Sequence, residues 1–329
     1  MDIIRSFTTH RRLLWVGLLV LVLILIATVP LYGGRYQTFL LAFILMYVIM
    51  AVAWAMFSGA TGYMSLAPAA FFGVGIYVMA LLQYELPFPL IIVTGGLASF
   101  ALALLVGLVT LRLRGMYFAI FTFGLVMLMQ QIFNYLESVR AHIHGRSIIP
   151  LDVTMLFYIM LGLVVITVLA VYFIRRSRYG LAMLSIGGNE EAAEHMGVNT
   201  TMVKILTFAI STVFMGAAGA VAAPLMIYVN PSIAFNVTYS FLPILMAVFG
   251  GMGQLYGPII GAFIFGYLDA TMRVKFFNYF MITFGIILVA VILFLPNGIA
   301  GLVPLLRDKL GRRILRLRNG GEGEQHANT

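Results

Sequence analysis

The sequence predicts an all-α polytopic membrane protein with about ten transmembrane helices. Of its 329 residues, 62% are hydrophobic and only 9% are charged, whereas about 25% of the residues in soluble domains are charged. The apolar runs are continuous, which argues against a β-barrel, because barrel strands alternate between apolar and polar residues over roughly ten positions. Lysine and arginine also gather in the segments on one side of the predicted membrane.

The first predicted span, residues 12–32, follows a basic start that contains Arg5, Arg11 and Arg12. Its apolar run is longer than the ~7–15 residue core of a signal peptide, and no small-residue cleavage site follows it. We therefore interpret it as a retained helix. The other spans, of about 20 residues each, are expected at 36–57, 64–83, 88–110, 115–135, 153–174, 203–226, 235–250, 255–271 and 277–295. Glycine and proline interrupt 64–83, 235–250 and 255–271, which predicts broken helices there.

The distribution of positive charge predicts the orientation of these spans. With a cytosolic N-terminus, the outer side receives only five of the 20 Lys and Arg residues, namely Arg35, Arg140, Arg146, Arg273 and Lys275. Cytoplasmic loops of membrane proteins carry an excess of Lys and Arg. The expected topology therefore has both termini in the cytosol, and the net charge of +9 is interpreted as this excess rather than as a nucleic-acid surface.

One transmembrane domain is expected over residues 1–306, with a polar cytosolic segment at 175–200. Residues 307–329 form a basic and then Gly/Glu-rich tail, too polar and too short for a domain of its own. Its basic part is expected to lie along anionic lipid headgroups, and a solvated tail is the alternative. The absence of cysteine excludes a cysteine-ligated metal.

The polar segment at 175–200 predicts a helix of about two turns. Asn189 is suited to cap its start, because its side-chain oxygen can accept a backbone N–H. Acidic residues in the first turn suit the helix dipole, and Gly197 suits the left-handed position that ends a helix. So short a helix needs a partner surface. That partner is either a groove on another protein or the bundle itself. The residues of this candidate site are Asn189, Glu190, Glu191, Ala192, Ala193, Glu194 and Gly197, with Met196 adding to a small apolar face formed by the two alanines.

No predicted span has an acidic or basic residue near its centre, and Glu85 and Asp269 are placed near outer ends. Ionisable residues inside the membrane are typical of ion-coupled transport. Their absence argues against a proton-driven transporter. Energy would then enter through the cytosolic segment.

Other motifs give no sign of an enzyme. GMGQLYGP (251–258) lacks the Lys-Ser/Thr of a phosphate-binding loop, and its glycines are interpreted as close helix contacts. His142 and His144 have cationic neighbours and no further ligands, so a solvated loop is favoured over a metal site. The sequence has no Ser-His-Asp set, no paired carboxylates at hydrolytic spacing and no HExxH. Ser65, Phe71, Asn236 and Ser240 are the candidates for a transport path.

EEAAEHMG (190–197) resembles the EAA-type coupling motif of ABC import permeases. Residues 58–82, 111–132, 177–223, 246–266 and 284–303 resemble, in order, blocks of the branched-chain amino acid permease family of the LivH/LivM type, and most of all the LivM side. The resemblance covers residues 40–305. This chain departs from the family at Ala67-Pro68 (usually Gly-His), at Ser185, Gly187 and Gly188 (where arginines are usual), and in the outer loop 138–150, which lacks a Thr-Gly-Gly feature.

The resemblance implies a type II-like permease subunit of a binding-protein-dependent ABC importer in a bacterial or archaeal cytoplasmic membrane. Two cytosolic ATPase subunits would hold ATP and magnesium, so this chain would bind no cofactor and would not itself be an enzyme. A second, related permease is expected to complete a heterodimer, and an extracytoplasmic binding protein to deliver the solute. Branched-chain or other small amino acids are the expected substrates. The alternatives are urea or amides, a simple sugar or a nucleoside, or an ion-coupled transporter that needs no ATPase.

Overall fold

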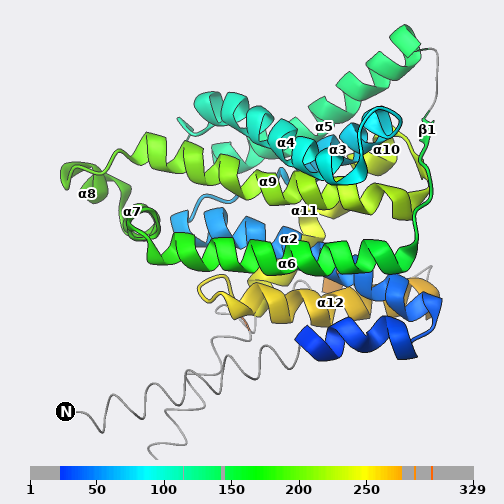
Figure 1. Cartoon of the computed structure of the whole chain (residues 1–329). Coiled ribbons are helices and arrows are strands. Elements are labelled where there is room, and N and C mark those ends of the chain that lie inside the picture. Colours follow the sequence, from blue (N-terminus) through cyan, green and yellow to red (C-terminus); the bar gives the residue numbers. More distant parts are fainter. Residues whose placement is uncertain (1–22, 114, 142–144, 276–284, 287–297, 299–329) are drawn as a thin grey trace, which may run out of the picture.

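A computed structural model describes residues 23–113, 115–141, 145–275, 285–286 and 298. Its long helices run side by side in one bundle (Figure 1). The helices are α2 (Arg35–Thr61), α3 (Pro68–Leu82), α4 (Phe88–Thr110), α5 (Met116–Tyr135), α6 (Val153–Arg176), α7 (Arg178–Gly188), α8 (Glu190–His195), α9 (Thr200–Met226), α10 (Pro231–Ala234), α11 (Thr238–Gly250) and α12 (Tyr256–Lys275). A π-helical turn, η1 (Leu136–Ala141), and the strands β1 (Arg146–Ser147) and β2 (Tyr228–Val229) complete the order.

Within the described residues, six helices are long and apolar enough to cross a membrane: Arg35–Thr61, Phe88–Thr110, Met116–Val139, Val153–Arg176, Thr200–Met226 and Pro231–Gly250. They confirm six of the predicted spans. The expected span at 64–83 is a shorter helix, Pro68–Leu82, and only Leu23–Tyr32 of the first span is described. The span expected at 277–295 and the tail at 307–329 lie outside the described residues.

One of the three expected helix breaks is present, because the chain leaves helical geometry at residues 62–67, between α2 and α3. In the second, α11 runs without a break from Thr238 to Gly250 and contains Pro243, and the chain is non-helical only just before it, between α10 and α11. The third expectation is wrong, because α12 runs without a break from Tyr256 to Lys275. Gly257 and Gly261 lie on one face of this helix and do not interrupt it.

The centre of the bundle is formed by α2 and α9. Of the 18 most apolar consecutive residues in each helix, 78% are buried in α2 and 72% in α9, compared with 28% in α5 and 28% in α6. Small residues bring the backbones together, as is common between helices in membranes. A Cβ atom added to Gly75 on α3 would lie 1.9 Å from the carbonyl oxygen of Gly216 on α9. The predicted glycine contact between α11 and α12 is likewise confirmed at Gly257, whose added Cβ would lie 2.1 Å from the oxygen of Gly251.

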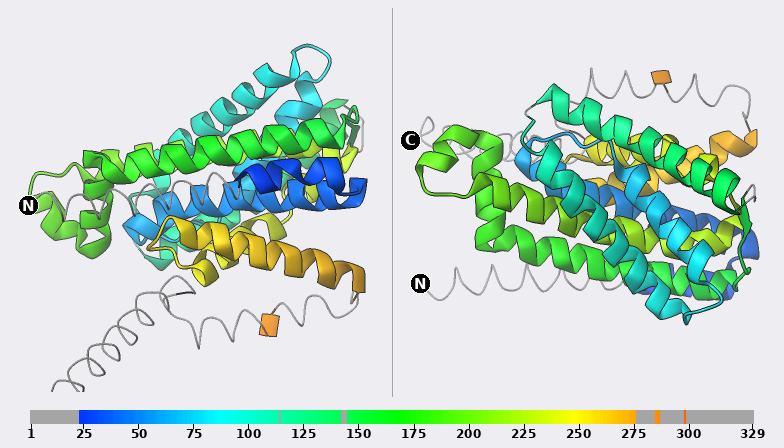
Figure 2. Two further views of the ribbon diagram at one scale, coloured as in Figure 1. Left: turned by 60° about the horizontal axis from the view of Figure 1, so that its bottom comes forward. Right: turned by 90° about the horizontal axis from the view of Figure 1, so that it is seen from above.

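The two ends of the bundle differ. At one end α7 and α8 project beyond the long helices (Figures 1 and 2); we call this the α8 end. At the other, the ladder end, β1 pairs antiparallel with β2, with Arg146 opposite Val229. The buried Glu137 accepts hydrogen bonds there from the Tyr77 hydroxyl at 3.1 Å and from the Gly145 backbone N–H at 3.1 Å. These contacts fasten the loop of β1 to α3.

Candidate functional site

The helix α8 forms as its sequence predicts. The side-chain oxygen of Asn189 accepts the backbone N–H of Ala192 at 3.1 Å. At the other end Gly197 has a φ of +86°, and the N–H of Val198 donates to the oxygen of Ala193 at 3.1 Å, a bond typical of a glycine-terminated helix. The predicted short helix with these two caps is therefore confirmed.

The apolar face predicted for α8 is divided in two. Ala193 is fully buried against the rest of the protein. Ala192 is exposed, and the Met196 side chain is 70% exposed. The three residues do not form the single face that was expected, because a helical step of about 100° per residue separates Ala192 from Ala193.

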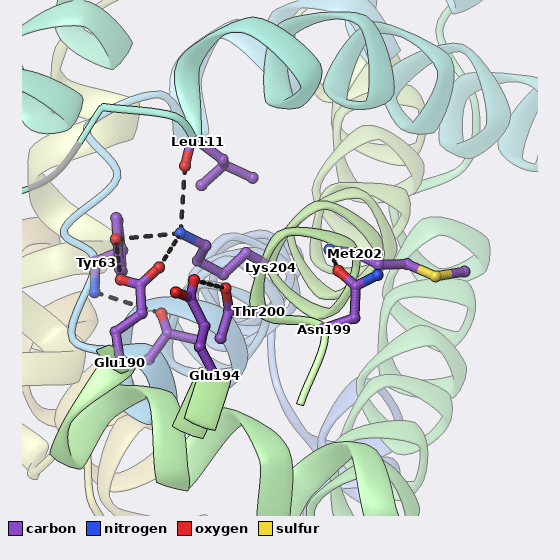
Figure 3. A network of polar contacts seen from close by, with 9 residues as sticks. Tyr63, Leu111, Glu190, Glu194, Asn199, Thr200, Met202 and Lys204 are labelled. Carbon is purple, nitrogen blue, oxygen red and sulfur yellow. Dashed lines mark hydrogen bonds and ion pairs between the residues drawn. The ribbon is translucent and has the colours of Figure 1, made fainter. Parts of the chain in front are cut away.

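Glu190 points back into the protein rather than outward (Figure 3). Its Oε1 lies 2.6 Å from the Nζ of Lys204, near the start of α9. The Tyr63 hydroxyl, in the segment after α2, donates to Oε2 of the same carboxylate. The Lys204 ammonium also donates to the Tyr63 hydroxyl at 3.2 Å and to the carbonyl oxygen of Leu111 at 3.3 Å. The contact therefore joins α8 to three other parts of the bundle.

The Glu190–Lys204 pair is well shielded from water. The side chains are 14% and 4% exposed, respectively. A lysine ammonium has three donors, and here each has a protein acceptor. Its Nζ also lies 4.6 Å from the centre of the Tyr63 ring, within the range of a cation–π contact. Such a satisfied pair holds its elements together, since removing either partner leaves a buried charge.

A second glutamate of α8 also binds this protein. The Thr200 hydroxyl donates to Oε1 of Glu194 at 2.6 Å, which joins the end of α8 to the start of α9. The sequence suggested three glutamates on one docking surface. The structure instead assigns Glu190 and Glu194 to internal contacts, and the Glu191 side chain is exposed.

The missing arginines before α8 have a partial explanation. A Cβ atom on Gly187 would lie 2.3 Å from the carbonyl oxygen of Ala60, so only glycine lets α7 pack on the end of α2. Nothing lies within 4 Å of a Cβ at Gly188, and no contact explains that glycine. Arg175, at the end of α6, donates instead to the carbonyl oxygens of Met252 at 3.1 Å and Gly253 at 3.3 Å.

The four candidate path residues do not all line one cavity. Ser65 and Phe71 line a cavity of only about 10 Å³, about the space of one water molecule. Ser240 lies beside the start of α3, where its Oγ accepts the backbone N–H of Ala69 at 3.0 Å. Asn236 is exposed and lines a separate cavity between α2, α11 and α12. Their role in a path stays a prediction.

Ser65 and Ser240 take part in hydrogen bonds that satisfy backbone groups at the break between α2 and α3. Backbone groups of a broken helix need partners when no water is present. The Trp54 indole donates to the Ser65 carbonyl oxygen at 2.7 Å, and the Thr122 hydroxyl accepts the Leu66 N–H at 2.9 Å. No side chain of its own segment caps α3, so the Ser240 hydroxyl, from α11, caps it across the bundle.

We expect Ser240→Ala to lower the free energy of unfolding by about 1–2 kcal/mol, because it leaves the buried Ala69 N–H without its acceptor. Thermal unfolding of the purified chain in detergent measures this. Ser211→Ala is the matched control. Its hydroxyl is also buried but donates only to Phe208 of its own helix, at 2.6 Å, so no donor is orphaned. Equal stability of the two variants would contradict the capping role.

Sequence reasoning does not identify Tyr63, Thr200 or the Leu111 carbonyl, whereas it expects Lys204, together with residues 175–179, to pass movement of the short helix to the flanking spans. A lysine one turn into an apolar helix that follows an acidic one was the available signal. No group of three His, Cys, Asp or Glu suited to a metal occurs among the described residues. His142 and His144 lie outside those residues.

The apolar bundle and its several long spans define a polytopic, multi-pass α-helical membrane protein. The sequence model of a family described as "Branched-chain amino acid transport system / permease component" matches residues 36–292. The chain belongs to this family, which confirms the resemblance seen in its motifs.

Three relatives place the chain within the family. It is 26% identical to the high-affinity branched-chain amino acid transport system permease protein LivM of Escherichia coli K12, over 97% of this chain and 80% of that protein. It is 31% identical to LivH of the same organism over 39% of this chain and 42% of that protein. It is 30% identical to the xylose transport system permease protein XylH of Haemophilus influenzae over 40% of this chain and 37% of that protein. No solved structure matches the chain.

Proposed function

We propose that this chain is the permease subunit of a binding-protein-dependent ABC importer and that α8 is its contact with a cytosolic ATPase subunit. The observation that carries the proposal is the buried Glu190–Lys204 pair, which fixes a projecting two-turn helix to the start of the long central helix α9. A force applied to α8 therefore reaches α9 directly. Membership of a transport-system permease family supports this assignment.

The proposed mechanism is alternating access. Two ATPase subunits bind ATP and magnesium and close, and their closure moves α8 on each permease chain. Glu190 and Lys204 pass the movement to α9, while Arg175 passes it to the turn between α11 and α12. ATP hydrolysis takes place on the partners, and this chain binds no cofactor. Met196, Ala192 and Glu191 supply the exposed face that docks.

The proposed substrates are branched-chain or other small amino acids. The names of LivM and LivH, both branched-chain amino acid permeases, support them. An extracytoplasmic binding protein would deliver the solute at the ladder end, and a related second permease would complete the path in a bacterial inner membrane. The match to XylH favours a simple sugar as the second candidate. Uptake of labelled leucine and xylose into the same proteoliposomes separates the two.

We expect Glu191→Lys to weaken assembly with the ATPase subunits by about tenfold or more, a change of about 1.4 kcal/mol or more, because it reverses a charge on the exposed face of α8. Co-purification of the ATPase subunits with the tagged full-length chain measures it. Glu85→Lys is the control, an exposed carboxylate beside the turn after α3 at the other end. Unchanged ATPase content and uptake in Glu191→Lys would contradict docking through this face.

A further inference from the structure

A cavity of about 360 Å³ lies between α2, α11 and α12. Its walls come from the first half of α2 and from residues near the end of α12, together with the start of α11. Because the other end of α2 packs against α7 through Ala60 and Gly187, the cavity lies in the half of the bundle nearer the ladder end. Its volume falls at the lower end of the range of about 300–1,000 Å³ for small-molecule sites.

The cavity runs from an open mouth to a buried wall. At the mouth, Tyr36 is 61% and Phe39 is 37% exposed. At the wall, Tyr47 and Asp269 are each 6% exposed. A buried carboxylate therefore forms part of a hollow that a solute can enter from outside the bundle.

The residues that line the cavity can bind both an ammonium group and a carboxylate group. Asp269 and the rings of Tyr36, Phe39, Phe43, Tyr47 and Tyr239 all line the cavity. A carboxylate and ring faces both attract an ammonium group. Asn236 and Thr238, on the α11 side, add an amide and a hydroxyl that can donate to a carboxylate. The Asn236 oxygen already accepts the Thr238 backbone N–H at 2.9 Å, so its amide nitrogen is the group available as a donor.

We propose that this cavity binds a small zwitterionic amino acid, with its ammonium at Asp269, its carboxylate at Asn236 and Thr238, and its side chain on the aromatic wall. The proposal rests on the proposed transport function and names the solute site within it. Asp269 also interacts within the protein. A carboxylate offers about four acceptor positions, so that interaction leaves room for an ammonium donor.

The test compares Asp269→Asn with Glu85→Gln, an exposed carboxylate outside the cavity, in the complete transporter reconstituted in proteoliposomes. Asp269→Asn is expected to raise the KM for labelled L-leucine by about tenfold or more, as for a lost charged hydrogen bond, with ATPase assembly unchanged. Glu85→Gln is expected to retain the KM of the original protein. A KM within twofold of the original in Asp269→Asn overturns the site.

A second readout separates recognition from a structural effect. The competitor 4-methylpentanoate is leucine without its ammonium group, and it should compete weakly with leucine in the original protein. In Asp269→Asn the affinity for leucine should fall to about that for 4-methylpentanoate, so that the two compounds bind about equally. If both weaken in parallel, Asp269 has only a structural role and the proposal fails. If vesicles rich in phosphatidylethanolamine displace bound leucine from the protein while phosphatidylglycerol vesicles do not, the cavity is a lipid headgroup site. That result also overturns the proposed amino-acid site.

Asn236→Asp keeps the proposal testable if Asp269→Asn does not fold. Asn236 is exposed, and the added charge should weaken leucine about tenfold but leucinamide much less, since leucinamide lacks the carboxylate. Equal effects on both overturn the assignment. If ATP drives uptake of xylose but not of leucine, the amino-acid site is refuted while the assignment as an ABC importer stands. The absence of ATP dependence for every solute would refute the importer itself.

Discussion

Glu190→Gln is expected to lower the free energy of unfolding by about 3–5 kcal/mol, the cost of breaking a buried pair by removing one partner. Glutamine keeps the size of the side chain and an acceptor oxygen but leaves the Lys204 ammonium without a counter-charge. That ammonium is only 4% exposed, so water does not replace the lost partner. ATP-driven uptake should fall by about tenfold or more, because the ion pair between α8 and α9 is then replaced by a weaker hydrogen bond from the Lys204 ammonium to an uncharged amide oxygen.

Removing the other partner of the pair should destabilise the protein less. Lys204→Met leaves the Glu190 carboxylate, which is 14% exposed and retains the Tyr63 hydroxyl as a donor. We therefore expect the free energy of unfolding to fall by about 1–3 kcal/mol. Thermal unfolding in detergent and uptake in proteoliposomes measure both effects. In the double variant stability should largely return while uptake stays low, since neither charge remains to be left unpaired.

Glu85→Gln is the control for this pair. It removes an exposed charge outside α8 and should change the free energy of unfolding by no more than about 0.5 kcal/mol, with uptake unchanged. If Glu190→Gln is as stable and as active as Glu85→Gln, then the pair neither holds α8 nor transmits its movement.

Gly75→Ala is expected to lower the free energy of unfolding by about 3 kcal/mol or more. The added Cβ would lie 1.9 Å from the carbonyl oxygen of Gly216, far inside contact distance. That oxygen belongs to the central helix α9, whose backbone is held on several sides and cannot turn away as a side chain would. Relief of the clash would require α3 and α9 to separate, which would also disturb Gly219, whose own added Cβ would lie 2.1 Å from the Phe72 oxygen.

Gly124→Ala, on α5, provides the comparison. Nothing lies within 4 Å of its added Cβ, and alanine favours a helix over glycine by about 1 kcal/mol. This variant should therefore be as stable as the original protein or slightly more so. Thermal unfolding and the yield of monodisperse protein from detergent measure both. If Gly75→Ala unfolds at the same temperature as Gly124→Ala, the close contact does not limit stability.

The features predicted from the sequence are those that depend on neighbouring residues. A run of about 20 apolar residues forms a span whatever its partners, and the predictions at 88–110 and 153–174 agree with α4 and α6 to within two residues. The caps of α8 also depend on local chemistry alone, so Asn189 and Gly197 were recognised correctly.

The site itself depends on contacts between distant residues. Tyr63 and Glu190 are 127 positions apart, and Ala69 and Ser240 are 171 apart. Polarity alone also does not distinguish a serine that lines a path from one that accepts a backbone N–H of a broken helix. For this reason the sequence marks Ser65 and Ser240 as candidates for a path and does not reveal the internal role of Glu190.

The break between α2 and α3 limits how the bundle can deform. Its backbone groups are held by side chains from α2, α5 and α11, through Trp54, Thr122 and Ser240. Displacing any one of these helices alone would orphan a buried polar group, at about 1–3 kcal/mol each, whereas moving them together with α3 orphans none. These four helices should therefore shift as a single rigid body, and the sliding surface of a transport cycle has to lie elsewhere in the bundle.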